Sequence, residues 1–203
     1  GNDMKYPRKN LWIHVLVLMI LMWSGGGMSH TDAKEKKSIP VIPPDLVASY
    51  LHSIIEADRT IYSTHIVGRL QKKGIISADE AWEQNNALLL PAQFLQKSGR
   101  VVAEKGTGIR YRLVSLWPIY ARNGPATAFE RKGLKIIMKQ PDKPYSGVIK
   151  SGKQQYFQAI YADKAVTESC VKCHNSHPLS PKRNFKLNDV MGAIVITIPL
   201  PRN

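Results

Sequence analysis

Apolar residues in the first half of the chain recur three or four positions apart, which is the spacing of one face of an α-helix. The stretch from residue 46 to residue 71 shows this pattern most clearly. Asp45 is suited to cap its first turn, and Gly74 is suited to end it. We therefore predict a long first helix with one mostly apolar face, made of Leu51, Ile54, Ile55, Asp58, Ile61, Tyr62 and His65.

Two further helices are predicted from the same kind of spacing. One covers residues 78–97, with Ser77 as its cap, although Pro91 inside it should start, kink or break the helix. The other is a short amphipathic helix at residues 126–139, which follows a turn-rich loop at residues 118–125.

The second half of the chain contains runs that are rich in β-branched and aromatic residues, which is typical of strands. Residues 109–117, 155–162 and 190–198 are predicted as strands, and residues 141–152 as a loop or hairpin. Helices come first, and the strands follow with one helix between them. This order predicts an α+β domain with an antiparallel sheet.

Residues 170–174 read Cys-Val-Lys-Cys-His, which is the attachment signal of a c-type haem. The thiols of Cys170 and Cys173 can each form a thioether to one vinyl group of the same porphyrin, and His174 then becomes the proximal axial ligand of iron. A structural zinc site would need two further ligands, and a thioredoxin-type dithiol would need a βαβ setting. A disulfide across this gap would constrain little. We therefore predict one covalently attached haem c.

The N-terminal region has the anatomy of an export signal. Basic residues follow Met4, and a mostly apolar run from Leu11 to Trp23 comes next. This run of 13 residues would form a helix about 20 Å long, which is short for an apolar bilayer core of about 30 Å. We favour a signal peptide, cleaved or partly retained, over a spanning anchor, and residues 4–23 give membrane association if the segment is kept.

These features divide the chain into three parts. Residues 1–30 are predicted as a signal peptide or N-terminal anchor, residues 31–44 as a lysine- and proline-rich linker, and residues 45–203 as the haem domain. The positive charge before the apolar run places the domain outside the cytoplasm, in the periplasm or an equivalent space.

Composition and charge limit the classes of partner. The chain is 43% hydrophobic and 22% charged over 203 residues, which suits one folded domain. Its formal charge of +14 favours acidic protein partners or anionic lipid headgroups. Nucleic acid is not expected, because an attached haem implies an extracytoplasmic location and because the basic residues are dispersed.

Five stretches of the chain stand in a specific order: residues 90–95, 111–119, 123–130, 170–175 and 190–199. This order resembles the PAS-like c-type haem domain, found alone in small exported cytochromes and as the sensor half of some bacterial histidine kinases and chemoreceptors. The resemblance covers residues 45–200. It implies a PAS-like antiparallel sheet flanked by N-terminal helices, with one haem c against the sheet. It also implies redox or small-ligand sensing, or electron transfer.

The ligand on the distal side of the haem is the open question. Some members of the family supply a distal cysteine, but both cysteines of this chain lie in the haem motif. His65 follows Ile61 and Tyr62 at helical spacing and is our candidate distal ligand; the alternative is a histidine at a helix edge, bonded to backbone or water. Met138 and Met191 are weaker candidates, and a vacant or water-bound site is the third alternative. His52 is expected to face solvent.

Two functions follow from these alternatives. A haem with two protein ligands suits an exported cytochrome that passes single electrons to a redox partner with an acidic docking surface. An open position suits a redox or gas sensor (NO, CO or O2) that signals to a separate membrane protein. An enzyme is not expected, because the sequence singles out no distal acid–base set. A role as a haem-carrying subunit of a larger complex remains a third alternative.

Overall fold

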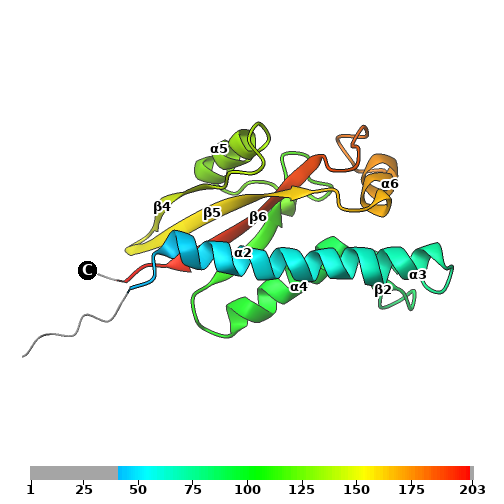
Figure 1. Cartoon of the computed structure of the whole chain (residues 1–203), viewed down its shortest axis with the longest axis horizontal. Coiled ribbons are helices and arrows are strands. Elements are labelled where there is room, and N and C mark those ends of the chain that lie inside the picture. The colour runs from blue at the N-terminus through cyan, green and yellow to red at the C-terminus, as the bar shows by residue number, and fades with distance from the viewer. Residues whose placement is uncertain (1–40, 202–203) are drawn as a thin grey trace, which may run out of the picture. The chain divides into compact units, whose positions relative to one another are not determined.

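A four-stranded antiparallel sheet forms the centre of the domain (Figure 1). We describe it from a computed structural model in which residues 41–201 are described. The strands lie in the order β3 (Arg110–Val114), β6 (Val190–Pro199), β5 (Gln154–Lys164) and β4 (Tyr145–Ser151). The continuous apolar sequence of β6 fits its position between two strands, where both of its faces are covered.

The predicted first helix is confirmed as one continuous helical segment, made of α2 (Pro44–Ile61), the π-helical η1 (Tyr62–Gly68) and α3 (Arg69–Lys72). Its predicted cap is wrong. The N-cap is Pro43, and Asp45 lies in the first turn, where a carboxylate is favourable beside the helix dipole.

The predicted second helix is wrong in its first half. Residues 78–90 instead contain two short parallel strands, β1 (Ala78–Asp79) and β2 (Leu88–Leu89), and helix α4 (Pro91–Glu104) follows. The Asp79 carboxylate accepts hydrogen bonds from the backbone N–H of Ala81, at 2.7 Å, and from Asn85, at 3.0 Å. This local pairing competes with a helix.

Pro91 decides where α4 begins. It occupies the first turn, where a missing N–H costs no hydrogen bond. The side chain of Gln93 accepts from the backbone N–H of Leu90 at 3.1 Å and so completes the cap. The segment is therefore a helix start and not an interrupted helix.

The remaining predictions agree with the structure apart from their ends. Helix α5 (Ala128–Ile137) begins at Thr127, whose hydroxyl accepts from the backbone N–H of Glu130 at 3.1 Å. The segment predicted as a loop or hairpin is a hairpin, with β4 paired to β5 and Gly152 in the turn at φ 59°. Gly152 suits this turn because only glycine adopts a positive φ without strain.

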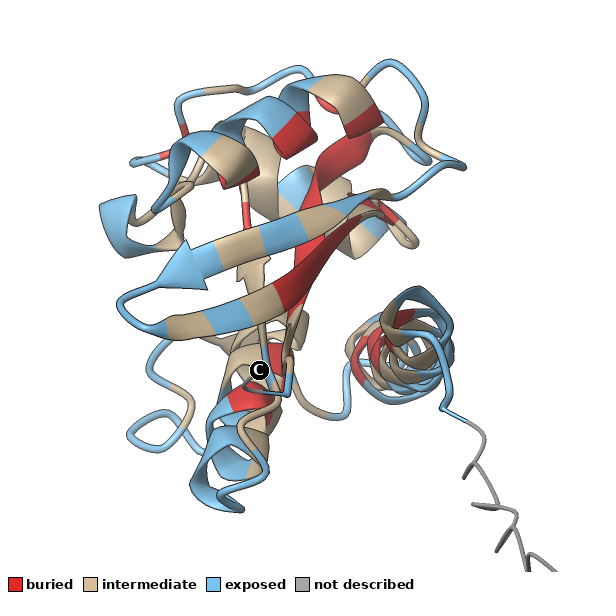
Figure 2. Ribbon diagram, turned by 90° about the vertical axis from the view of Figure 1, so that its left-hand side faces the viewer, coloured by how far each residue is buried: buried red, intermediate tan, exposed pale blue. Residues whose placement is uncertain are grey.

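The sheet lies between two helical layers, with α2 and α4 on one side and α5 on the other (Figure 2). Alternate residues of β6 face these two layers. Ile194 and Ile196 point to the side of α2 and α4, where they pack with Ala48 and Leu95. Their neighbours Ala193 and Val195 point to the other side and pack with Leu134 and Ile137 of α5. The sheet thus holds two cores, and α2 is fixed along one of them.

Several predictions fall outside the described part of the chain. The export signal at residues 1–30, the membrane association of residues 4–23 and most of the linker at residues 31–44 belong to this group. Within residues 41–201, no helix is long and apolar enough to cross a membrane.

Candidate functional site

The haem motif lies on one short helix, α6 (Glu168–Ser176). Thr167 caps this helix by accepting a hydrogen bond from the backbone N–H of Cys170 at 3.4 Å. Residues three or four positions apart share one side of a helix. Cys170 therefore lies on the same side as Cys173 and His174, and the three side chains form one wall of a cavity.

Apolar and aromatic side chains pack against α6 and hold it in place. Cys170 and Val171 pack against a buried cluster of Ala165, Phe185 and Met191. The side chain of Asn175 also binds the backbone of Phe185 twice: it donates to the carbonyl oxygen and accepts from the N–H, at 2.9 Å in both cases. These contacts fix the position of the helix against the sheet.

The ring of His174 is oriented by the same loop. It meets the ring of Phe185 edge to face, with centroids 5.9 Å apart. Its Nδ1 atom is buried and has no hydrogen-bond partner among the described residues. Burial lowers the pKa of His174, and the positive charges of Arg59 and His177 lower it further. The neutral ring that results can offer a lone pair to a metal ion.

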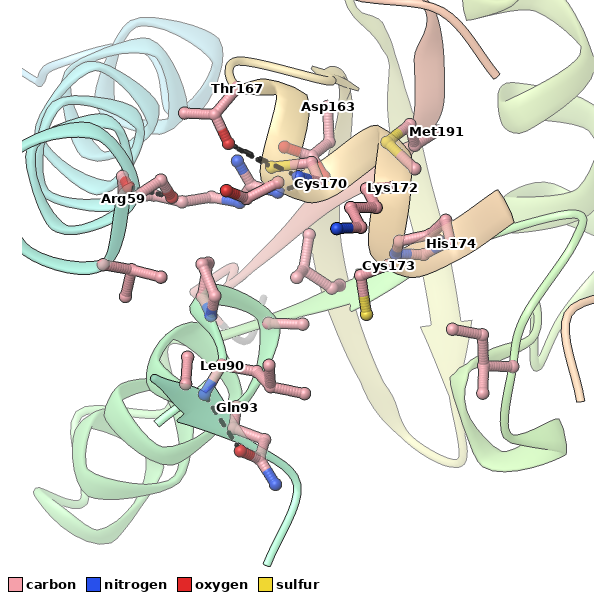
Figure 3. A pocket seen from close by; sticks show the side chains of 18 of the residues that line it. Arg59, Leu90, Gln93, Asp163, Thr167, Cys170, Lys172, Cys173, His174 and Met191 are labelled. Carbon is pink, nitrogen blue, oxygen red and sulfur yellow. Dashed lines mark hydrogen bonds and ion pairs between the residues drawn. The ribbon is translucent and has the colours of Figure 1, made fainter. Parts of the chain in front are cut away.

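The cavity in front of α6 has a volume of about 1540 Å³. This volume exceeds the range of roughly 300–1,000 Å³ that is typical of small-molecule sites. Its other walls come from η1, α3, the start of α4 and the loop that follows β3. Figure 3 shows the Cys173 sulfur pointing from α6 into this space. Two thiols, an imidazole and a large cavity are a donor set and a space that fit a c-type haem.

A buried ion pair lies at the same cavity and was not predicted from the sequence. The Arg59 guanidinium of α2 donates to the Asp163 carboxylate of β5 at 2.9 Å, and both side chains are 9% exposed. Figure 3 shows Arg59 reaching toward α6. Burial raises the pKa of Asp163, and the nearby Glu56 adds to this effect while Arg59 opposes it.

The prediction for His52 is wrong. It stacks on Tyr161 with ring centroids 3.9 Å apart, and its side chain is 15% exposed. Arg59, which shares its side of the helix, is buried as well. The sequence pattern was misleading because this polar side of α2 faces the sheet, where Asp163 and Tyr161 provide partners.

The structure brings His65 to the cavity of His174. His65 belongs to η1, on a side that is exposed, and it makes no hydrogen bond or ion pair with a described residue. Of the two methionines that were weaker candidates for the distal ligand, Met191 lines the cavity on the side of α6. Met138, at the end of α5, does not line it. Ligation by His65 therefore stays a prediction.

Charged residues around the cavity are mostly basic. We call the following set the basic rim: Arg69, Lys72, Lys73, Arg122 and Lys172. The acidic residues among the cavity lining are Glu80, Asp163 and Glu168, and Asp163 is already paired with Arg59.

Comparison with known proteins identifies the fold and the family of this chain. A crystal structure of the cyanobacterial haem protein Tll0287 matches with a TM-score of 0.50 and 15% sequence identity, over 80% of this chain and 99% of that chain. This likeness confirms the expected PAS-like α+β fold. No match is found among curated protein sequences. The model of the Tll0287-like family matches residues 45–199, and the chain therefore belongs to this family.

Proposed function

We propose that this protein is an exported c-type cytochrome that carries single electrons on one haem attached at Cys170 and Cys173. The observation that carries the proposal is that both thiols and His174 project from α6 into one cavity. The similar structure is described as that of a haem protein, which supports the same class of cofactor. A bound haem c would supply one-electron exchange at its iron.

Attachment at these two thiols needs no oxidant or reductant. Cys170 and Cys173 would each hold the porphyrin through one thioether, in which the S–H bond is replaced by a bond from sulfur to one vinyl carbon and the hydrogen goes to the other vinyl carbon. Both cysteines are free, as this chemistry requires. Burial raises the pKa of Cys173, with Glu80 and Cys170 adding to the effect, which favours the neutral thiol.

The protein residues have separate roles in holding the cofactor. His174 would be the iron ligand on the side of α6, and its edge-to-face contact with Phe185 would orient its ring. Asn175 ties α6 to the loop that carries Phe185. Arg59 and Asp163 place a fixed, buried pair of charges on the cavity wall, where low polarity strengthens their effect on a nearby charge.

The basic rim supports a redox partner with an acidic docking surface. The whole chain carries a formal charge of +14, and the basic rim adds positive charge at the cavity through which electrons would pass. Complementary charge speeds the encounter of two proteins and aligns their surfaces. We place this encounter outside the cytoplasm, as the N-terminal sequence predicts, and expect no nucleic acid partner.

One observation favours a second function. Among the described residues that line the cavity, His65 is the only histidine besides His174. If neither His65 nor Met191 bound the iron, the sixth position would be open to NO, CO or O2. The protein would then report redox state or gas to a membrane partner.

A redox titration followed by CO addition tests the proposal. The protein is produced with c-type haem maturation and titrated while the visible spectrum is recorded, and CO is then added to the reduced form. A single one-electron transition and a spectrum unaffected by CO support the electron carrier. Rapid and complete CO binding overturns the carrier and supports the sensor.

A further inference from the structure

The outward side of α5 carries basic side chains and no exposed acid. Arg131, Lys132 and Lys135 are exposed on the helix, and Lys139 is exposed just past its end. Together with residues 125–128 and Ile136, they line a surface hollow of about 600 Å³. We call the four residues Arg131, Lys132, Lys135 and Lys139 the α5 basic face.

No described carboxylate neutralises the α5 basic face. The one acid of α5, Glu130, is 3% exposed, and its carboxylate accepts hydrogen bonds from Arg112 and from the backbone N–H of Ala126, at 2.6 Å in both cases. None of the four basic residues forms an ion pair with another residue of the described range 41–201, although Lys132 lies over the Tyr145 ring. The positive charge of this surface is therefore available to a partner.

Basic residues at these positions weaken the helix that carries them. Arg131 lies near the N-terminal end of α5, where the helix dipole disfavours positive charge. Lys135 is four residues from Arg131 and three from Lys132, so like charges are neighbours on the helix surface. A local rule that is broken with no gain in stability is expected at a functional site. The α5 basic face therefore indicates an anionic partner.

The composition of the hollow favours a lipid surface over an acidic protein. Specific protein interfaces have a central core of aromatic or large apolar side chains that bury deeply in the partner. The hollow offers only one large apolar side chain, Ile136, and no aromatic one. Lysine side chains are long and carry compact, strongly hydrated charges, which suits a layer of phosphate headgroups that has no fixed arrangement.

The N-terminal sequence favours the same partner. The apolar run at residues 11–23 is short for a bilayer core and lies outside the described residues, so this point depends on the sequence alone. A weak apolar anchor gives stable membrane attachment when a basic surface acts with it. The α5 basic face is such a surface on the folded domain.

We propose that the α5 basic face docks the domain on the phosphate headgroups of an anionic bilayer. The proposal does not depend on haem binding, because no residue that lines this hollow also lines the cavity of His174. Helix α5 covers the side of the sheet opposite α2 and α4 (Figure 1). Docking through α5 therefore leaves the basic rim free for a redox partner.

Co-sedimentation with lipid vesicles tests the docking surface. The haem-loaded full chain, as the producing cell processes it, should bind vesicles of equal parts phosphatidylglycerol and phosphatidylcholine more tightly than vesicles of phosphatidylcholine alone. Added salt should weaken this binding. The double variant Arg131→Gln with Lys135→Gln should weaken it about 30-fold, because each base near an anionic surface contributes to the attraction.

A second double variant is the matched control. Arg100→Gln with Lys105→Gln removes the same charge from the exposed side of α4 and from its C-cap, on the other side of the sheet. It should bind anionic vesicles much as the wild type does. Unchanged visible and circular dichroism spectra show that both variants are folded.

Several results would overturn the proposal. Equal losses for the two double variants would assign the binding to net charge and not to α5. A wild type that binds both kinds of vesicle equally, or neither, would remove the role of headgroup charge. Soluble polyglutamate is the remaining probe: if the α5 variant loses binding to polyglutamate but keeps binding to vesicles, the partner is an acidic protein and not a lipid surface.

Discussion

Two walls of the cavity are built in different ways. The α6 wall is built mainly from a continuous segment: Thr167 caps the helix, and Asn175 binds Phe185 ten residues away. The wall made by α2 and η1 is held from far along the chain, through an ion pair between Arg59 and Asp163 that are 104 residues apart. The difference shows that Cys170, Cys173 and His174 are positioned mainly by local sequence, whereas the opposite wall of the cavity is positioned by long-range packing.

The largest expected effect concerns the long-range ion pair. Arg59→Ala leaves the buried Asp163 carboxylate without its partner and should lower the free energy of unfolding by about 3–5 kcal/mol. Urea unfolding followed by circular dichroism measures this. The double variant Arg59→Met with Asp163→Leu should recover most of the loss, because two apolar side chains can replace a buried pair. A small loss for Arg59→Ala would contradict the assigned role.

The pH dependence of the free energy of unfolding is a second test of the ion pair between Arg59 and Asp163. The pKa of Asp163 is raised in the folded protein, so in the window just above its unfolded pKa the folded state binds more protons than the unfolded state. Its contribution to the free energy of unfolding therefore decreases as pH rises through that window. The loss caused by Arg59→Ala should shrink at acidic pH, where Asp163 becomes neutral. Unfolding curves that keep the same separation at every pH would rule this out.

Substitutions in the α6 wall should lower the free energy of unfolding by less than the loss of the ion pair does. Asn175→Ala removes two hydrogen bonds to the backbone of Phe185 and should cost about 1–3 kcal/mol, since the groups left behind are partly buried. It should also change the visible spectrum, because Phe185 orients His174. Asn184→Ala is the matched control, because Asn184 is exposed and, among the described residues, its side chain bonds Lys182 and not the backbone of Phe185. An unchanged spectrum would show that the hydrogen bonds between Asn175 and Phe185 do not control the orientation of the His174 ring.

The cap of α6 is a smaller test of the local wall. Thr167→Ala removes the side-chain acceptor for the backbone N–H of Cys170 and should cost about 1 kcal/mol. Thr167→Ser keeps a hydroxyl and should cost less. Both values come from denaturant unfolding, and equal losses for the two variants would show that the hydroxyl is not what matters.

The smallest effect on stability is expected at His65. His65→Ala removes an exposed side chain and should change the free energy of unfolding by no more than about 0.5 kcal/mol. If His65 binds the iron, the ferric and ferrous visible spectra should change, while Ile66→Ala on the same turn leaves them unchanged. An unaltered low-spin spectrum for His65→Ala removes this residue as the distal ligand.

Sequence reasoning succeeded where the signal is local. The helical period of the first helix and the apolar run of β6 each depend on neighbours along the chain, and the structure confirms both elements. The spacing of residues 170–174 is local in the same way, and haem attachment there stays a prediction. The resemblance to a PAS-like domain added the order of these segments, and the fold agrees with it.

Sequence reasoning failed where residues far apart in the chain decide which side chains are buried. The burial of Arg59 depends on Asp163, and the burial of His52 depends on Tyr161, which no local pattern reveals. The helical period also cannot say which residues of α2 face the sheet. For residues 78–90, the start of α4 at Pro91 and the side-chain hydrogen bonds of Asp79 overrode a pattern that suited a helix.

The most direct test of the central claim is whether haem stays bound to the chain when the chain is unfolded. The protein is produced with c-type haem maturation, denatured and extracted with acidified acetone, and the mass of the intact chain is measured. The account predicts that haem remains on the wild type and is lost only when Cys170 and Cys173 are both replaced by alanine. Complete extraction of haem from the wild-type chain would contradict it.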